Sequence, residues 1–204
     1  ETRFTALASG EVDLLVRNST WTFSRDTELA FDFVAVNYYD GQGFMVRKDL
    51  GVSSAKELDG ARICIQTGTT TELNLADYFK SNNMQYKQVT VQDDSQAQQQ
   101  FLAGACDAYT TDASGLAASR ATMPDAANFI ILPEIISKEP LGPVVRHGDN
   151  NWGDVVRWTY YALLIAEEKG ITKANIEEVA GSTTDPEARR LLGLDGDMGK
   201  KIGL

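Results

Sequence analysis

The chain has 204 residues, with 29 acidic against 19 basic side chains and a formal net charge of −10 at pH 7. A hydrophobic fraction of 43% and a charged fraction of 24% are ordinary for a globular protein and argue against intrinsic disorder. An acidic chain without a basic block is a poor nucleic-acid binder, because phosphate contacts need clustered Lys and Arg. No apolar run approaches the roughly 20 residues of a membrane span, so no direct membrane insertion is expected.

The rare reactive residues narrow the chemistry further. The single histidine, His147, follows a strand-like run and enters a polar turn, which excludes two-histidine zinc motifs and favours a solvated loop. Cys64 and Cys106 stand in separate strand-like runs without a CxxC motif, so neither a metal nor a cofactor is indicated. The two cysteines are buried thiols in a reducing compartment or a disulfide in an exported protein, and the residues alone leave both open.

In chain order, the apolar pattern predicts a helix at residues 2–9, a strand at 12–17, a polar loop at 18–26 and an apolar segment at 29–39. Further strands are expected at 43–47, 62–66, 88–92, 107–111, 129–132 and 142–146. Helices are expected at 71–81, 95–102, 113–121 and 154–169, the last with Trp158 facing inward. This alternation of strands and helices predicts an α/β fold with mostly parallel sheets.

Ligands of such folds bind at the carboxyl ends of strands, where three polar loops stand out. The first, Asn18–Arg25, gathers hydroxyls, an amide and the Arg25 guanidinium, whose planar fork suits a carboxylate. The same loop is also typical of a solvated segment in which Arg25 pairs with Asp26 or Glu28. Both interpretations stay open from the residues alone.

The other two loops precede predicted helices. Thr69 and Glu72 fit a capping box, and the helix-start amides near Gly68 either attract an anion or are simply capped. Asp112 either caps the next helix or presents a carboxylate to a cation. Together the three loops suggest a zwitterion site, in which a guanidinium and amides face an anion and a carboxylate faces an ammonium group.

These loops lie in long, specific motifs: NSTWTFSRD, FDFVAVNYYDGQGFMVRKDLGV, ELDGARICIQTGTTTELNLADYF, GACDAYTTDASGLA and ILPEIISKEPLGPVVRHGD. They resemble the periplasmic general L-amino-acid-binding proteins of ABC transporters, within solute-binding protein family 3. The resemblance implies a two-lobe α/β fold that closes on an amino acid. It places the two hinge crossovers at Gly43–Arg47 and Leu141–Val145. It also divides the chain into a partial first lobe (1–46), an intact second lobe (47–140) and a return into the first lobe (141–204), with the first lobe truncated at both ends.

The resemblance also assigns roles to the loop residues. Arg25 is expected to hold the α-carboxylate, with Thr20 beside it. Asn18 is expected to contribute backbone groups from the same loop. Thr69 and Thr70 are expected to add hydroxyl and N–H groups to the carboxylate.

Asp112 is expected to take the α-ammonium group. Trp21, Tyr38 and Tyr39 are either pocket walls or lobe packing. The implied periplasmic location favours a Cys64–Cys106 disulfide.

The expected function is capture of an L-amino acid and its delivery to an inner-membrane ABC permease, with no catalytic step and no cofactor. One alternative is a truncated or degenerate relative with impaired ligand binding. A second is an enzyme like the cyclohexadienyl dehydratases, for which the loops offer only Asp112 as a general acid.

Overall fold

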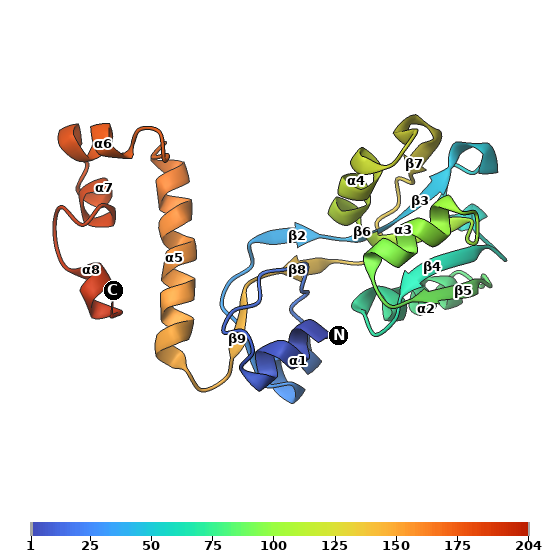
Figure 1. Ribbon diagram of the computed structural model, residues 1–204, viewed down its shortest axis with the longest axis horizontal. Helices are drawn as coiled ribbons and strands as arrows, with labels where there is room; N and C mark the ends of the chain where they lie inside the picture. Colours follow the sequence, from blue (N-terminus) through green and yellow to red (C-terminus); the bar gives the residue numbers. More distant parts are fainter. Residues whose placement is uncertain (1, 204) are drawn as a thin grey trace. The chain divides into compact units, whose positions relative to one another are not determined.

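A computed structural model describes residues 2–203, which fall into two compact units (Figure 1). Unit 1 comprises residues 2–5, 18–21 and 37–141, and unit 2 comprises residues 6–17, 22–36 and 142–203. The chain thus passes between the units repeatedly, at positions 36/37 and 141/142 among others. The predicted lobe boundaries at residues 46 and 140 stay a prediction.

Unit 1 is built on a five-stranded sheet in the order β5-β4-β6-β3-β7. Its strands are β3 (Gln42–Arg47), β4 (Arg62–Gln66), β5 (Lys87–Val91), β6 (Ala108–Asp112) and β7 (Phe129–Ile131). β4 pairs in parallel with β5 and β6, whereas β3 runs antiparallel to both β6 and β7. The sheet is therefore mostly parallel, as expected, with β3 as the one reversed strand.

Helices cover both faces of this sheet because its strands are apolar on both sides (Figure 1). On one face, Phe44 of β3 packs with Leu75 and Phe79 of α2. On the other, the next residue of β3, Met45, packs with Phe101 of α3. The helices are α2 (Thr70–Ser81), α3 (Asp94–Leu102) and α4 (Ala113–Thr122), with single 3-10 turns at Lys48–Leu50, Ala55–Glu57 and Ala126–Asn128.

A second, two-stranded ribbon belongs to unit 1. β2 (Tyr38–Asp40) pairs antiparallel with β8 (Glu139–Leu141), and the segment 18–21 lies against β8. Thr20 forms an isolated bridge with Leu141, and the Trp21 N–H donates to the Pro140 carbonyl at 2.8 Å. The first candidate ligand loop is thereby fixed to β8.

In unit 2, β1 (Phe31–Phe33) pairs antiparallel with β9 (Val144–Arg146). Val34 and Val145 form a small core with Val156 of α5. The remaining helical elements are α1 (Thr2–Ser9), a turn at Ser24–Glu28, α5 (Asn150–Glu168), α6 (Ile176–Ser182), α7 (Pro186–Leu191) and α8 (Met198–Lys201). Among the described residues, none of these helices has both the length and the apolar character to cross a membrane.

Several sequence-based predictions were wrong in detail. The strand at 12–17 is absent: only Leu15 is buried and bridges Val144, while the Arg146 guanidinium binds the Val12 carbonyl at 2.7 Å. The loop at 18–26 ends in the helical turn Ser24–Glu28. Trp158, expected inward on the long helix, is 54% exposed.

The first expected hinge crossover, Gly43–Arg47, does not coincide with a boundary between the two compact units. Gly43–Arg47 lies inside β3, where it is hydrogen-bonded on both sides within the sheet of unit 1. The chain leaves unit 2 earlier, between Val36 and Asn37. Leu141–Val145, the second expected crossover, does contain the boundary at 141/142.

The structure confirms a disulfide between Cys64 of β4 and Cys106, which precedes β6. Both residues are fully buried on the α3 side of the sheet, and they close a loop across a sequence separation of 42. A cross-link of this span restricts the unfolded chain, which stabilises the folded state by about 2–4 kcal/mol.

Replacing both cysteines by alanine should therefore lower the free energy of unfolding by about 2–4 kcal/mol. Urea unfolding followed by circular dichroism measures this loss. Treatment with a reductant should shift the wild-type midpoint and leave the double variant unmoved. Equal sensitivity of both proteins to the reductant would contradict a stabilising disulfide.

Candidate ligand-binding site

Polar side chains gather in unit 1 where β6 ends and β3 begins. The register pairs Gln42 with Asp112 and Phe44 with Thr110, so these four side chains share the face that α2 covers. Gln42 is fully buried, and its amide nitrogen donates to Thr110 Oγ1 at 2.9 Å and to the Thr71 carbonyl at 3.1 Å. One buried amide therefore links the ends of β3 and β6 to the start of α2.

Asp112, the last residue of β6, is a buried carboxylate, 7% exposed. It accepts a hydrogen bond from Asn18 Nδ2 at 3.1 Å. Burial raises its pKa to about 6, and the neighbouring Asp40 and Glu139 add to the rise. The hydrogen bond from Asn18 and the charge of Arg3 act in the opposite direction without cancelling it. A carboxyl group in this state gains from any cation placed beside it.

The alternative role of Asp112, as the cap of the next helix, is excluded. Asp112 occupies the N-cap position of α4 but makes no side-chain capping bond. Asp40 does this instead: it accepts a hydrogen bond from the Ser114 hydroxyl and one from the Ser114 N–H at 3.4 Å. The Asp112 side chain therefore accepts from Asn18 and takes no part in capping α4.

Glu139 of β8 is a second buried carboxylate, 2% exposed, which sequence reasoning did not identify. Thr20 and Thr70 donate their hydroxyl protons to Oε2, the latter at 3.3 Å. Asn74 Nδ2 and the Ser137 hydroxyl donate to Oε1 at 2.7 and 2.6 Å. The available signal was a lone carboxylate in an otherwise apolar, strand-like stretch, EPLGPVV.

Thr69 caps the start of α2, as the capping-box pattern predicts, whereas Glu72 returns to the N–H of Gly68, one residue before the cap. The Thr69 hydroxyl accepts from the Glu72 N–H at 3.3 Å and donates to the Gln66 carbonyl at 2.8 Å. Glu72 in turn accepts from the Gly68 N–H at 2.9 Å. The Thr69 hydroxyl is therefore engaged by the helix start, and its expected contact with a ligand stays a prediction.

The six candidate residues are thus divided between the units. Asn18, Thr20, Thr70 and Asp112 belong to one polar group of unit 1, and Thr69 adjoins it. Arg25 belongs to unit 2, where it is buried on the helical turn. Its backbone N–H donates to Thr22 Oγ1 at 3.3 Å.

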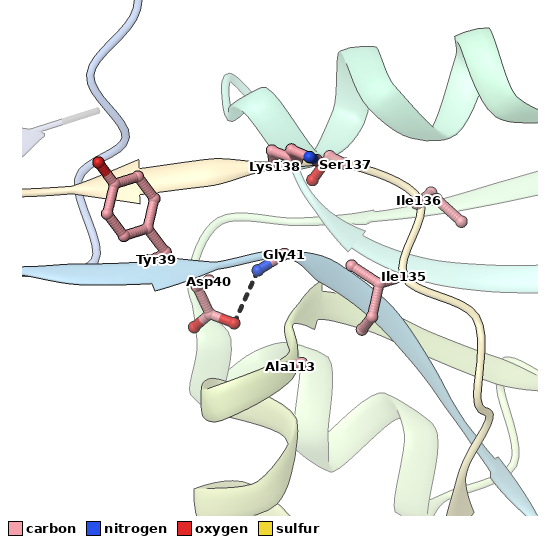
Figure 2. Close-up of a pocket in the computed structure, with 8 residues that line it drawn as sticks. All are labelled: Tyr39, Asp40, Gly41, Ala113, Ile135, Ile136, Ser137 and Lys138. Carbon is pink, nitrogen blue, oxygen red and sulfur yellow. Dashed lines mark hydrogen bonds between the residues drawn. The ribbon is translucent and has the colours of Figure 1, made fainter.

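A cavity of about 810 Å³ opens in unit 1 beside β2 (Figure 2). Tyr39, which is 79% exposed, lines it with Asp40, Gly41, Ala113 and residues 135–138. Tyr39 is therefore a wall of this cavity. Tyr38 and Trp21, at 54% and 38% exposed, are outside its lining.

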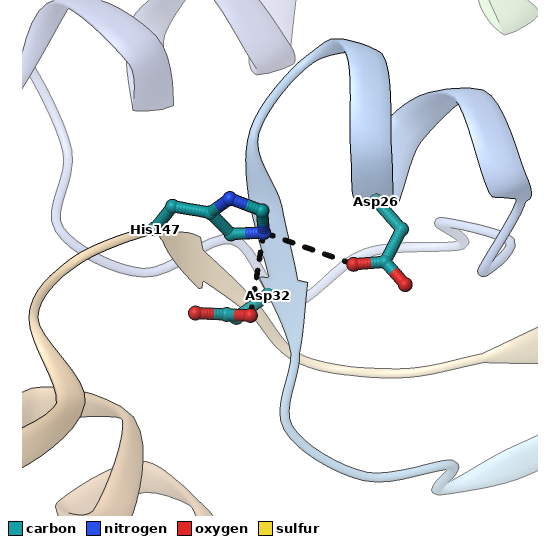
Figure 3. A group of neighbouring side chains, drawn as sticks. All are labelled: Asp26, Asp32 and His147. Carbon is teal, nitrogen blue, oxygen red and sulfur yellow. Dashed lines mark ion pairs between the residues drawn. The ribbon is translucent and has the colours of Figure 1, made fainter.

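One group in the described part of the chain has the composition of a metal site: Asp26, Asp32 and His147 of unit 2 (Figure 3). His147 Nε2 lies 3.3 Å from Asp32 and 3.7 Å from Asp26. These separations are ordinary for an imidazole beside two carboxylates, so the geometry needs no metal. The prediction that His147 is solvated is consistent with its 42% exposed side chain.

Comparison with known proteins identifies the family. The family described as NMT1/THI5 like matches residues 2–136, and the chain belongs to this family. The chain is 81% identical over 204 residues to the glutamate/glutamine/aspartate/asparagine-binding protein BztA of Rhodobacter capsulatus, covering 60% of that protein. It is 58% identical to the general L-amino acid-binding periplasmic protein AapJ of Rhizobium johnstonii, covering 99% of this chain and 60% of AapJ.

Comparison with solved structures gives binding proteins as well. A periplasmic binding protein from Brucella ovis with glutathione bound is 54% identical, with a TM-score of 0.95 over 99% of this chain and 64% of that one. An ancestral arginine-binding protein bound to arginine is 27% identical, with a TM-score of 0.69 over 86% of this chain and 74% of that one. The resemblance and the fold class predicted from the sequence are therefore confirmed. The chain spans about 60% of the length of the curated relatives it matches.

The raised pKa of Asp112 makes stability depend on pH. Between the unfolded value of 3.8 and the folded value of about 6, the native state holds a proton that the unfolded chain releases. The free energy of unfolding therefore falls as pH rises through this window, and Asp112→Asn removes that loss. Between pH 4 and pH 8, the stability of the variant relative to wild type should rise by about 2–3 kcal/mol.

Urea unfolding of both proteins at these two pH values measures the difference. Asp49→Asn is the matched control, because that side chain is 77% exposed. Parallel stability profiles of wild type and Asp112→Asn would show that burial does not perturb this carboxyl group.

Proposed function

We propose that the protein carrying this chain is the periplasmic solute-binding component of an amino-acid ABC transporter. It captures an L-amino acid and delivers it to an inner-membrane permease without chemical change. The observation that carries the proposal is Asp112, a buried carboxyl group with a pKa raised to about 6 at the end of β6. The names of the relatives, which are amino-acid-binding proteins, support the same ligand class.

Asp112 provides a counter-charge for the α-ammonium group. An ammonium placed beside Asp112 would relieve the cost of burying its negative charge, so binding and ionisation reinforce each other. Asn18 donates to the same carboxylate and orients it. A charge-assisted hydrogen bond of this kind contributes about 1.5–3 kcal/mol.

Arg25 is the proposed partner of the α-carboxylate. A guanidinium grips a carboxylate with two parallel hydrogen bonds, a geometry that lysine does not reproduce. Asp112 and Arg25 read only the frame common to all amino acids. The preference for a particular ligand side chain is therefore open. The first ligands to test are those in the names of the relatives: glutamate, glutamine, aspartate, asparagine and glutathione.

Calorimetric titration of the protein with the twenty amino acids and glutathione tests the proposal. Saturable binding of at least one L-amino acid is expected, with weaker binding of its D-enantiomer. A failure of all twenty to bind would overturn the proposal in favour of a relative with impaired binding. Release of a chemically altered product would instead favour an enzyme.

Arg25→Ala should weaken binding of every ligand by a similar factor, because the α-carboxylate is common to them all. The loss of one charge-assisted interaction corresponds to about 10- to 150-fold in Kd. Arg17→Ala, in the same unit and at an exposed position, is the matched control. A loss confined to one side-chain class would show that Arg25 reads the side chain rather than the backbone.

A further inference from the structure

The strands that connect the two units have an irregular stretch at Gly142–Pro143. This pair of residues separates β8, in unit 1, from β9, in unit 2. On one side, β1 ends opposite Val144 and β2 begins opposite Leu141, which leaves four residues, 34–37, facing two. Two extra residues in one strand form a bulge, which bends the strand and interrupts its ladder of hydrogen bonds.

The segment on the other side of β8 and β9 has a bulge of the same size. Its isolated bridges, to the first residue of β9 and the last residue of β8, are made by Leu15 and Thr20. Residues 16–19 therefore also face Gly142–Pro143. We call residues 16–19, 34–37 and 142–143 the bulged zone. Three passages of the chain between the units, at 17/18, 36/37 and 141/142, fall inside it.

Gly142 is needed in this zone because two backbone segments approach closely. A Cβ atom at this position would lie 1.9 Å from the carbonyl oxygen of Ala35 and 3.1 Å from its carbonyl carbon. Both of these are backbone atoms, so any side chain at position 142 would push the segments apart. Glycine also has the widest choice of backbone conformations, which suits a point at which the chain passes from one unit to the other.

Side chains of α5 hold the backbone of the 34–37 bulge. Arg157 Nε donates to the Val34 carbonyl at 3.1 Å. The Tyr160 hydroxyl donates to the Val36 carbonyl at 3.1 Å. Arg157 and Tyr160 are three residues apart and both half-buried, so they project from one side of the helix. Two carbonyl groups of the bulge are therefore bonded to a helix.

The peptide group held by Tyr160 is the one at which the chain changes units. It joins Val36, the last residue of this stretch of unit 2, to Asn37, the first residue of the next stretch of unit 1. Its N–H, which belongs to Asn37, donates to the Leu141 carbonyl at 2.9 Å. Tyr160 thus fixes one end of this peptide group while the ladder of unit 1 fixes the other.

We infer that Arg157 and Tyr160 form a latch: by holding two carbonyl groups of the bulge against α5, they limit how far the two units can change their relative orientation. Rotation between packed units is usually absorbed by a few residues at the ends of strands or helices. The bulged zone offers such residues, and the latch restrains them. This inference concerns the connection between the units, so it stands whichever ligand the proposed function assigns.

Tyr160→Phe removes one hydrogen bond of the latch and keeps the ring. Exchange of the Asn37 N–H with solvent deuterium should become about two- to tenfold faster, because loss of one hydrogen bond eases local opening by that factor. Spin labels at Gln100→Cys on α3 and Glu168→Cys on α5, both exposed positions, report the units directly. Pulsed electron paramagnetic resonance should show a broader distribution of label–label distances in the variant.

Tyr161→Phe is the matched control, because this neighbouring tyrosine is 38% exposed and its hydroxyl has no hydrogen-bond partner among the described residues. It should leave both the exchange rate and the distance distribution unchanged. The double variant Arg157→Gln/Tyr160→Phe removes the whole latch and should broaden the distribution further. A double variant with the wild-type distribution would overturn the inference. Unchanged exchange of the β4 amides confirms that unit 1 is folded in every variant.

Gly142→Ala tests the same zone from the opposite strand. Its Cβ would displace the Ala35 carbonyl, which lies between the two carbonyls that the latch holds, so the distance distribution should change. Because both changes act on one bulge, adding Tyr160→Phe should then have a smaller effect than in the wild-type background. Gly181→Ala, in α6, is the control, because a Cβ there meets nothing within 4 Å. Additive effects of Gly142→Ala and Tyr160→Phe would contradict the inference.

Discussion

The structure of the candidate site depends on the burial of a carboxylate. A buried negative charge is strongly unfavourable unless hydrogen bonds replace the water it has lost. Glu139 obtains them from segment 18–21, from α2 and from its own strand region. Satisfying this one group therefore holds together three parts of unit 1 that are far apart in the chain, and fixes the side chains that surround the predicted ligand.

The two buried carboxyl groups of the site have different surroundings. Glu139 accepts from four side chains, whereas burial of Asp112, which accepts from Asn18, raises the pKa of that carboxyl group. Saturation makes Glu139 part of the framework. The cost of burying the Asp112 charge makes an incoming cation favourable, so one carboxylate organises the site and the other is suited to binding.

Local signals predicted much of this architecture. The capping box of Thr69 and Glu72 is a contact within one helical turn, and the strands of the main sheet are short apolar runs between turns. The Glu139 network was not predictable in this way, because its donors Thr20 and Thr70 are 119 and 69 residues away. The strand expected at 12–17 failed for a related reason: the segment pairs with β9 through the single bridge Leu15–Val144, and the distant Arg146 side chain binds the Val12 carbonyl.

Asp112 shows how a tertiary contact decides between two roles that local sequence leaves equal. An aspartate before a helix ordinarily caps it, since its oxygen satisfies a free N–H of the first turn. Asp40, at the end of β2, meets that requirement for α4 through Ser114. The cap is thus supplied by another strand, and the residue at the capping position is released to accept from Asn18. The binding role proposed for Asp112 depends on Asp40 supplying this cap. A carboxylate that capped its own helix would have its charge partly neutralised by the helix dipole.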